Sequence, residues 1–295
     1  MITRREMLRG SLALSGAALF APHLFSAVPI PENRQYTEQL GWTIGPQIYS
    51  FNRFPFDEAL KMIVACGTPH FEVFVGQKVS KDINVAVGPD LLKPENSEVL
   101  KKVKDLLAET GCIMHAVGVC GSSRPFFDFA AEFKIPLLNT EPNARELENV
   151  NKLADEYKIN VGLHNHPKPS YYWDPDVVLG HLKDLGPRMG ANCDTGHWLR
   201  SGLNPLECIK KLKGRITGFH IKDLKKREDG NFDADAPFGQ GVVGIAEIMK
   251  EVATHSIKVP FSIEYEAAWD SNQPKVAECI RFFDATAREI VMARR

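Results

Sequence analysis

The segment Val161-Gly162-Leu163-His164-Asn165-His166 alternates its side chains in the manner of a β-strand and ends in histidines. Because the side chains of a strand point alternately to its two faces, Val161 and Leu163 share one face and His164 lies on the other. Three later segments, at residues 190–194, 217–222 and 261–266, repeat this design. The face opposite the apolar side chains carries the four ionisable residues His164, Asp194, His220 and Glu264. Successive strands that direct imidazoles and carboxylates inward predict one shared site.

From residue 40 onward, extended apolar runs alternate with helical patterns. The predicted strands span 42–49, 71–75, 112–119, 135–140, 159–165, 188–194, 215–222 and 260–265, and the predicted helices span 56–66, 96–110, 125–133, 144–157, 175–185, 204–213, 244–254 and 274–293. Eight strand–helix units predict an α/β fold, a single (β/α)8 TIM barrel over residues 40–295. The alternative, a doubly wound open sheet, would favour a glycine-rich first turn, and Gly45-Pro46-Gln47 does not provide one.

Polar residues gather late in the predicted strands, which agrees with a barrel whose active site lies at the C-terminal ends of its strands. They are Gln47, Tyr49, His115, Asn139, Glu141, His164, His166, Asp194, His197, His220, Lys222, Glu264 and Glu266.

Composition excludes several classes of protein. The 295 residues are 44% hydrophobic and 25% charged, as in ordinary globular domains, and the net charge of −1 provides no general attraction for nucleic acid. The six cysteines form no CxxC pair, which argues against a thiolate zinc site. We therefore expect no nucleic-acid partner, and association into a homo-oligomer stays open.

Four motifs, Leu163–His166, Cys193–His197, His220–Asp223 and Ile263–Glu266, resemble those of the xylose-isomerase-like barrel superfamily, the sugar phosphate isomerases and epimerases. The resemblance runs from about residue 41 to the last helix. It implies a divalent metal held by strands five to eight, at the positions of His164, Asp194, His220 and Glu264. Imidazole mixed with carboxylate suits Mn²⁺, Zn²⁺, Co²⁺ or Fe²⁺ better than Ca²⁺.

One position departs from the pattern of this superfamily. Many of its members carry glutamate where His164 stands, and in the epimerases that glutamate is both a ligand and an acid–base group. Glu141 could replace it as ligand or base, and His166 could bind the metal in place of His164. The candidates for proton transfer are therefore Glu141, His166 and Glu264, because moving a proton beside a carbonyl requires a base.

The predicted substrate contacts are His197, Lys222, Glu266 and Trp198. Alternatives remain for two of them, since Lys222 could form a salt bridge to Glu264 or Glu266 and an aromatic side chain such as Trp198 more often packs in the core. Asp194 could also cap a short turn before Gly196. The segment 225–243, with its Gly239-Gln240-Gly241, reads as an inserted loop, and Asp223 reads as a charge on it.

These features predict a metal-dependent enzyme that acts on a carbohydrate, a sugar or keto-glycoside, by removing a proton next to a carbonyl. Isomerisation or epimerisation would return the proton, whereas a lyase or dehydratase would expel a β-substituent. The change at His164 and an export signal favour the second outcome. The alternatives are a non-catalytic sugar-binding barrel and a DNA-repair endonuclease of the endonuclease IV type, against which the net charge argues.

The first 30 residues read as a signal segment rather than as part of the barrel. A basic start with Arg4-Arg5 and Met7-Leu8 precedes an apolar stretch from Ser11 to Val28 and resembles a twin-arginine signal. It predicts export to the periplasm, and no later run is long enough to insert stably in a membrane. Replacing both arginines by lysine should retain the protein in the cytoplasm, as fractionation and immunoblotting would show; unchanged secretion of the variant would indicate another route.

Overall fold

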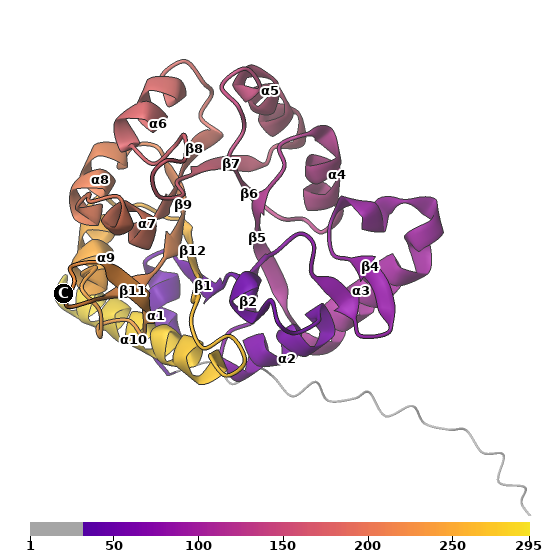
Figure 1. Ribbon diagram of the computed structural model, residues 1–295, viewed down its shortest axis with the longest axis horizontal. Coiled ribbons are helices and arrows are strands. Elements are labelled where there is room, and N and C mark those ends of the chain that lie inside the picture. Colours follow the sequence, from indigo (N-terminus) through magenta and orange to yellow (C-terminus); the bar gives the residue numbers. More distant parts are fainter. Residues whose placement is uncertain (1–31) are drawn as a thin grey trace, which may run out of the picture.

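A computed structural model describes residues 32–295, apart from the side chains of residues 233 and 234, so the predicted signal segment lies outside the described residues. Eight parallel strands surround a central axis (Figure 1). They are β1 (Thr43–Pro46), β2 (His70–Val73), β5 (Ile113–Cys120), β6 (Leu137–Thr140), β7 (Asn160–His164), β8 (Met189–Asp194), β9 (Ile216–Ile221) and β12 (Pro260–Ile263). Their order is β1-β12-β9-β8-β7-β6-β5-β2, and a parallel bridge between Gln47 and Glu72 joins the two ends of that series.

A ring of helices covers the outside of the strands. It comprises α2 (Phe56–Ala65), α3 (Ser97–Thr110), α4 (Arg124–Glu132), α5 (Leu147–Tyr157), α6 (Pro175–Leu182), α8 (Pro205–Leu212), α9 (Ile245–Thr254) and α10 (Gln273–Met292). The helix α2 shows why these helices pack on the strands. Its buried residues Phe56, Ala59, Leu60 and Ile63 recur at helical spacing and so form one apolar face. The predicted (β/α)8 barrel is confirmed, with element ends displaced by a few residues.

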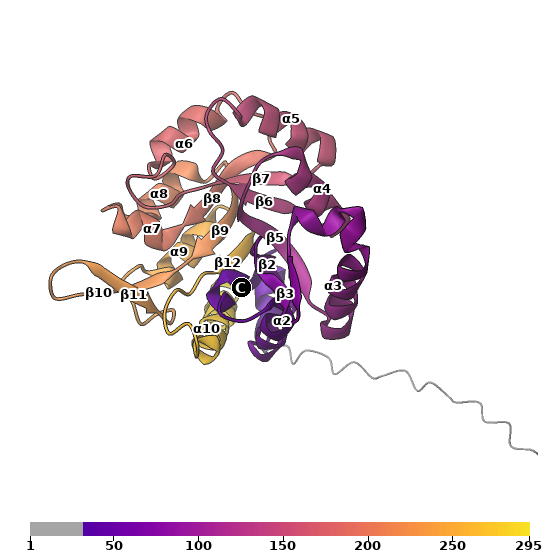
Figure 2. The same ribbon diagram turned by 45° about the vertical axis from the view of Figure 1, so that its right-hand side comes forward.

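The structure adds elements that the apolar periodicity did not predict. The additional helices are α1 (Arg34–Gln39) and α7 (Thr195–Arg200), the short 3-10 turns are η1 (Ile48–Phe51), η2 (Pro89–Leu92) and η3 (Pro94–Asn96), and the two hairpins are β3 (Lys78–Ser80) with β4 (Ile83–Ala86) and β10 (Asp223–Lys226) with β11 (Phe232–Ala236). The second hairpin projects from the barrel (Figure 2). It corrects the expectation of a plain loop over 225–243. Its two strands pair only with each other and not with the barrel sheet. The apolar pattern that identifies a barrel strand is therefore not required of them.

Asp223 organises the chain that returns from this hairpin. Its carboxylate accepts backbone N–H bonds from Gly239, Gly241 and Val243 at 2.9, 3.0 and 3.1 Å, and the side chain is buried. A Cβ at Gly241 would lie 2.1 Å from Asp223 Oδ1, so this approach requires glycine. Asp223 is therefore a buried anchor and not the loop charge expected from the sequence.

Within residues 32–295, no helix has both the length and the apolar character needed to cross a bilayer.

The first and last helices are joined by a buried ion pair. Arg34 Nε donates to both carboxylate oxygens of Asp284, at 3.0 and 3.1 Å, and Thr37 Oγ1 donates to Oδ1 at 2.6 Å. Arg34 also donates to Thr68 Oγ1 at 3.2 Å, which links this pair to the chain just before β2. These bonds hold the α1 helix against α10 and against the segment that precedes β2.

Removal of Arg34 should leave Asp284 buried without its countercharge. We expect Arg34→Ala to lower the free energy of unfolding by about 3–5 kcal/mol in urea titrations. The double variant Arg34→Met/Asp284→Leu should lose less than the sum of the two single variants. Arg188→Ala removes a partner of Asp155 that is 34% exposed and is the control, with an expected loss below about 1 kcal/mol. Equal losses in the two arginine variants would contradict this role.

Candidate active site

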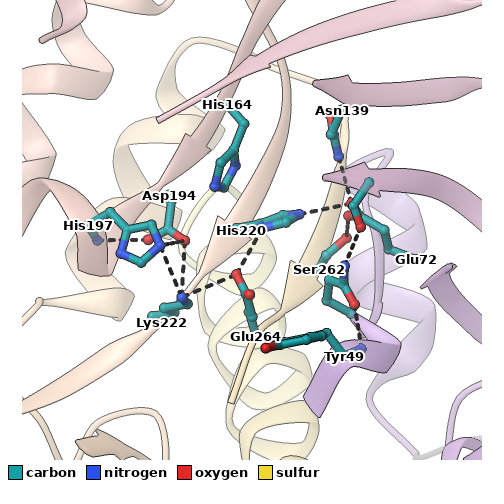
Figure 3. Close-up of polar contacts among 12 residues, drawn as sticks. Tyr49, Glu72, Asn139, His164, Asp194, His197, His220, Lys222, Ser262 and Glu264 are labelled. Carbon is teal, nitrogen blue, oxygen red and sulfur yellow. Dashed lines mark hydrogen bonds and ion pairs between the residues drawn. The ribbon is translucent and has the colours of Figure 1, made fainter. Parts of the chain in front are cut away.

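The ends of β7, β8, β9 and β12 bring His164, Asp194, His220 and Glu264 together inside the barrel (Figure 3). His164, Asp194 and His220 are fully buried, and one nitrogen or oxygen of each lies within 4.8 Å of the others. Glu264 Oε2 lies 3.0 Å from His220 Nδ1. The inward-facing side chains of these four strands thus form one cluster, as expected for strands that share a barrel interior.

Glu72, on β2, belongs to this cluster although the sequence reasoning did not select it. Its Oε1 atom accepts from His220 Nε2 at 2.9 Å and from Asn139 Nδ2 at 3.0 Å, and its Oε2 atom accepts from Ser262 Oγ at 2.5 Å. Burial would raise the pKa of Glu72, but His220 and these hydrogen bonds lower it below the ordinary value. The alternation Phe71, Glu72, Val73 was the available signal, since it places Glu72 on the inward face.

His220 is bonded through both ring nitrogens to carboxylates. Burial would lower its pKa, but Glu72 and Glu264 outweigh burial and raise the pKa to about 10. Glu264 in turn has its pKa held well below the usual range, because Lys222 and His220 outweigh the effect of its burial. Because Glu72 holds Nε2, the Nδ1 atom is the one that faces Glu264 and the centre of the cluster.

Two buried atoms of the cluster have no hydrogen-bond partner among the described residues: His164 Nε2 and Asp194 Oδ2. Asp194 Oδ1 accepts from His197 N at 2.8 Å and caps α7, so the expected cap coexists with an oxygen that forms no hydrogen bond. Burial and then the neighbouring His220 hold the pKa of His164 well below its ordinary value, which makes it a neutral imidazole. Asn192 Nδ2 lies 3.1 Å from His164 Nδ1, and Asn192 Oδ1 is also unpartnered among these residues. If the side-chain amide of Asn192 turns by half a rotation, its Oδ1 atom accepts a hydrogen bond from Nδ1–H of His164. The lone pair of His164 Nε2 is then free.

Lys222 forms the charged wall of the cluster. Its Nζ atom lies 2.7 Å from Glu266 Oε2, 3.2 Å from Glu264 Oε2 and 3.4 Å from Asp194 Oδ2. Burial would lower the pKa of this amine, but the carboxylates of Asp194 and Glu264 raise it above the ordinary value. The ammonium therefore balances carboxylates, and the salt bridge considered for Lys222 is present.

Glu141 and His166 form a pair at the rim. Glu141 Oε1 accepts from His166 N at 3.0 Å and from His166 Nδ1 at 2.8 Å, and the His166 side chain is 46% exposed. The hydrogen bond that His166 donates to Glu141 outweighs partial burial and raises the pKa of His166. The His166 ring centroid lies 4.6 Å from that of His164. Glu141 thus orients His166 so that Nε2 is available to an incoming molecule.

The helix α7 positions a second group of side chains. His197 Nε2 lies 3.4 Å from Lys222 Nζ and 3.5 Å from Asp194 Oδ2, and burial together with Lys222 lowers the pKa of His197 far enough to keep it neutral. Trp198, in contrast, is 1% exposed and belongs to the hydrophobic core. The structure gives Trp198 a packing role in place of the predicted substrate contact.

The donor set fits a divalent transition metal. Imidazole nitrogens are available from His164 and His220 and carboxylate oxygens from Asp194 and Glu264, and two of these ligand atoms have no hydrogen-bond partner among the described residues. Glu72 behind His220 is the kind of carboxylate that orients a histidine ligand. A second group within 4.8 Å, His164, His166 and His197, offers an alternative at the rim.

Comparisons with known proteins agree with the barrel fold. The family model described as xylose isomerase-like TIM barrel matches residues 60–286. The chain is 25% identical over 196 residues to inosose dehydratase 2 of Bacillus cereus, an alignment that covers 58% of this chain and 63% of that protein. A crystal structure of an uncharacterized protein from Parabacteroides distasonis has 27% identity and a TM-score of 0.65, covering 82% of this chain and 98% of that one. A xylose isomerase-like TIM barrel protein from Mycobacterium smegmatis in complex with magnesium shares the fold, with 16% identity, a TM-score of 0.64 and coverage of 81% and 91%.

The pairing of Glu141 with His166 can be tested by titration. In wild type, the His166 ring should titrate above the ordinary histidine value of about 6.5. Glu141→Gln removes the charged acceptor, so the midpoint should move to lower pH in NMR titrations of ¹³C-histidine-labelled protein. Glu251→Gln is the matched control, because it removes a carboxylate from His255 elsewhere and should not move the His166 midpoint. An unchanged midpoint in Glu141→Gln would contradict the pairing.

Proposed function

The chain belongs to the xylose isomerase-like TIM barrel family, and we propose that it is a divalent-metal-dependent enzyme that removes a proton next to the carbonyl of a keto-sugar or keto-glycoside. The observation that carries this proposal is the convergence of His164 Nε2 and Asp194 Oδ2, both buried and without hydrogen-bond partners among the described residues, beside His220 and Glu264. Burying an imidazole nitrogen and a carboxylate oxygen without hydrogen bonds is costly, and a metal bound between them would offset that cost, which supports metal binding over simple sugar binding.

In this proposal His164, Asp194, His220 and Glu264 hold the metal. When bound there, a divalent cation supplies Lewis acidity to a carbonyl oxygen and a neighbouring hydroxyl. Glu72 keeps Nε2 of His220 protonated, so that Nδ1 is the ligand atom. Lys222 stays outside the ligand set and neutralises the carboxylates of Glu264 and Glu266.

His166 is the group that moves the proton. Its Nδ1–H is held by Glu141, which leaves the Nε2 lone pair free to accept a proton from carbon, and the resulting imidazolium is stabilised by the same carboxylate. Glu264 is less suited to this task, because its oxygen is tied to His220 and Lys222. The partial exposure of His166 supports this role, because an incoming substrate could reach its ring.

Dehydration is the reaction that this arrangement favours. His166 Nε2 takes the proton from the carbon next to the carbonyl, the β-hydroxyl leaves, and the imidazolium returns its proton to that hydroxyl to form water. A single acid–base group on one face can perform both transfers, whereas epimerisation needs a second group on the opposite face. The similarity to an inosose dehydratase supports the same reaction class, over part of both chains.

Purified protein loaded with Mn²⁺, Zn²⁺, Co²⁺ or Fe²⁺ should convert keto-glycosides or inososes, as followed by NMR in D₂O. Loss of water gives an unsaturated ketone, and solvent deuterium at carbon reports proton removal. Asp194→Asn should lose stoichiometric metal by elemental analysis and lose turnover with it. Asp176→Asn, a surface carboxylate paired with Lys211, is the control and should keep both. Full metal content in Asp194→Asn would remove Asp194 from the ligand set.

Loss of the base should separate chemistry from metal binding. His166→Gln should reduce kcat by about 10²–10⁴-fold with metal content unchanged. His255→Gln replaces a histidine that also pairs with a glutamate, and it should leave kcat unchanged. Wild-type turnover in His166→Gln would show that another group removes the proton.

A further inference from the structure

A cavity opens at the same end of the barrel as the candidate active site. It has a volume of about 410 Å³ and is lined by segments that follow β1 and β2, including Arg53, Phe74, Gln77, Lys78 and Ser80. These segments leave the C-terminal ends of their strands, so the cavity lies at the same end of the barrel as His164 and Asp194. Neither the metal ligands nor the Glu141–His166 pair line this cavity.

Two polar atoms in the wall of the cavity lack partners. Gln77 is 4% exposed and donates from Nε2 to Phe51 O at 3.3 Å and to Phe54 O at 2.8 Å, while its Oε1 atom has no partner among the described residues. Ser80, 5% exposed, also has no partner there for Oγ. Because buried polar atoms normally form hydrogen bonds, these two are suited to bind hydroxyl groups from outside the chain.

An aromatic wall connects this cavity to the active site. The Tyr49 ring lies 4.8 Å from the Phe74 ring and 5.7 Å from the Trp269 ring, centroid to centroid, in edge-to-face arrangements. Tyr49 extends toward Glu264 in Figure 3, and Phe74 lines the cavity. A molecule that reaches from Glu264 into the cavity therefore passes over aromatic surface, which suits the apolar faces of sugar rings.

The rim of the cavity is cationic. Arg53 and Lys78 are exposed and form no ion pair within residues 32–295, whereas Lys81 is paired with Glu58 at 2.7 Å. Two uncompensated cations beside unpartnered hydrogen-bonding atoms favour a ligand that combines hydroxyl groups with an anionic group.

We propose that this cavity is a second subsite that binds the outer ring of an acidic disaccharide, a glycoside whose outer sugar carries a carboxylate. The inference rests on the proposed function, because it names the substrate class of the same enzyme. The inner keto-sugar lies over Glu264 and His166, the linkage crosses Tyr49 and Phe74, and the outer ring meets Gln77 and Ser80. The carboxylate is bound by Arg53 and Lys78.

Binding of unreactive disaccharides tests the subsite without turnover. By calorimetry, wild-type protein should bind a glucuronate-containing disaccharide about 10-fold more tightly than cellobiose, and cellobiose more tightly than methyl glucoside. Arg53→Gln/Lys78→Gln should abolish the preference for the acidic sugar while keeping cellobiose binding. Lys101→Gln/Lys104→Gln on the outer face of α3 removes the same charge and should change neither.

Turnover separates failure of the subsite from failure of the proposed function. Ser80→Tyr should fill the cavity and raise KM for 3-keto-disaccharides about 10-fold, with no change for methyl 3-keto-glucoside. Equal affinity for all three sugars in wild type, unaltered in the Arg53/Lys78 variant, would overturn the subsite. Preferential binding of the acidic disaccharide with no turnover of any keto-sugar would uphold the subsite and refute the proposed reaction.

Discussion

The buried imidazole of His220, held between Glu72 and Glu264, is the interaction on which the site depends. It joins β2, β9 and β12, and Glu72 extends the network to Asn139 on β6 and Ser262 on β12. Such a network stabilises a fold only when its members are satisfied, because an unpaired charge in the interior is costly. The same bonds therefore tie β2 to β6, β9 and β12 across the interior of the barrel and fix the direction of the His220 ring.

This arrangement lets the protein carry charge in its centre with or without a metal. Without one, protonated His220 forms ion pairs with Glu72 and Glu264, and Lys222 forms ion pairs with Asp194, Glu264 and Glu266. A divalent cation coordinated by His220 Nδ1 would take the place of the proton on that nitrogen, so the cluster would gain a metal and release a proton. His164 is already neutral, so it would bind a metal through Nε2 without releasing a proton once the Asn192 amide turns to accept from Nδ1.

The rim of the barrel has a different organisation from its interior. His166 is partly exposed and the hydrogen bond to Glu141 raises its pKa, whereas His164 and His197 are held neutral by burial. In the proposed reaction, proton transfer belongs to His166 and metal binding to His164, which lies two residues earlier in the chain and deeper in the barrel. The hairpin β10–β11 contributes to this rim through Asp235, whose Oδ2 atom accepts from Glu266 N at 2.6 Å.

The amino-acid sequence by itself determined the eight strand–helix units and the inward face of four strands, because side-chain alternation and helical spacing are local properties of the chain. The same alternation places Glu72 on the inward face of β2, but no motif distinguished it as a site residue. Only the tertiary structure decided which residues pair over long distances in the sequence: Glu72 bonds His220, Glu141 accepts a hydrogen bond from His166, and Asp223 binds the backbone of the returning chain. It also decided that Trp198 lies in the hydrophobic core, because depth of burial depends on the packing of the whole barrel. Pairing across a barrel follows from strand register and closure, and these are set by the packing of the whole chain rather than by any one segment.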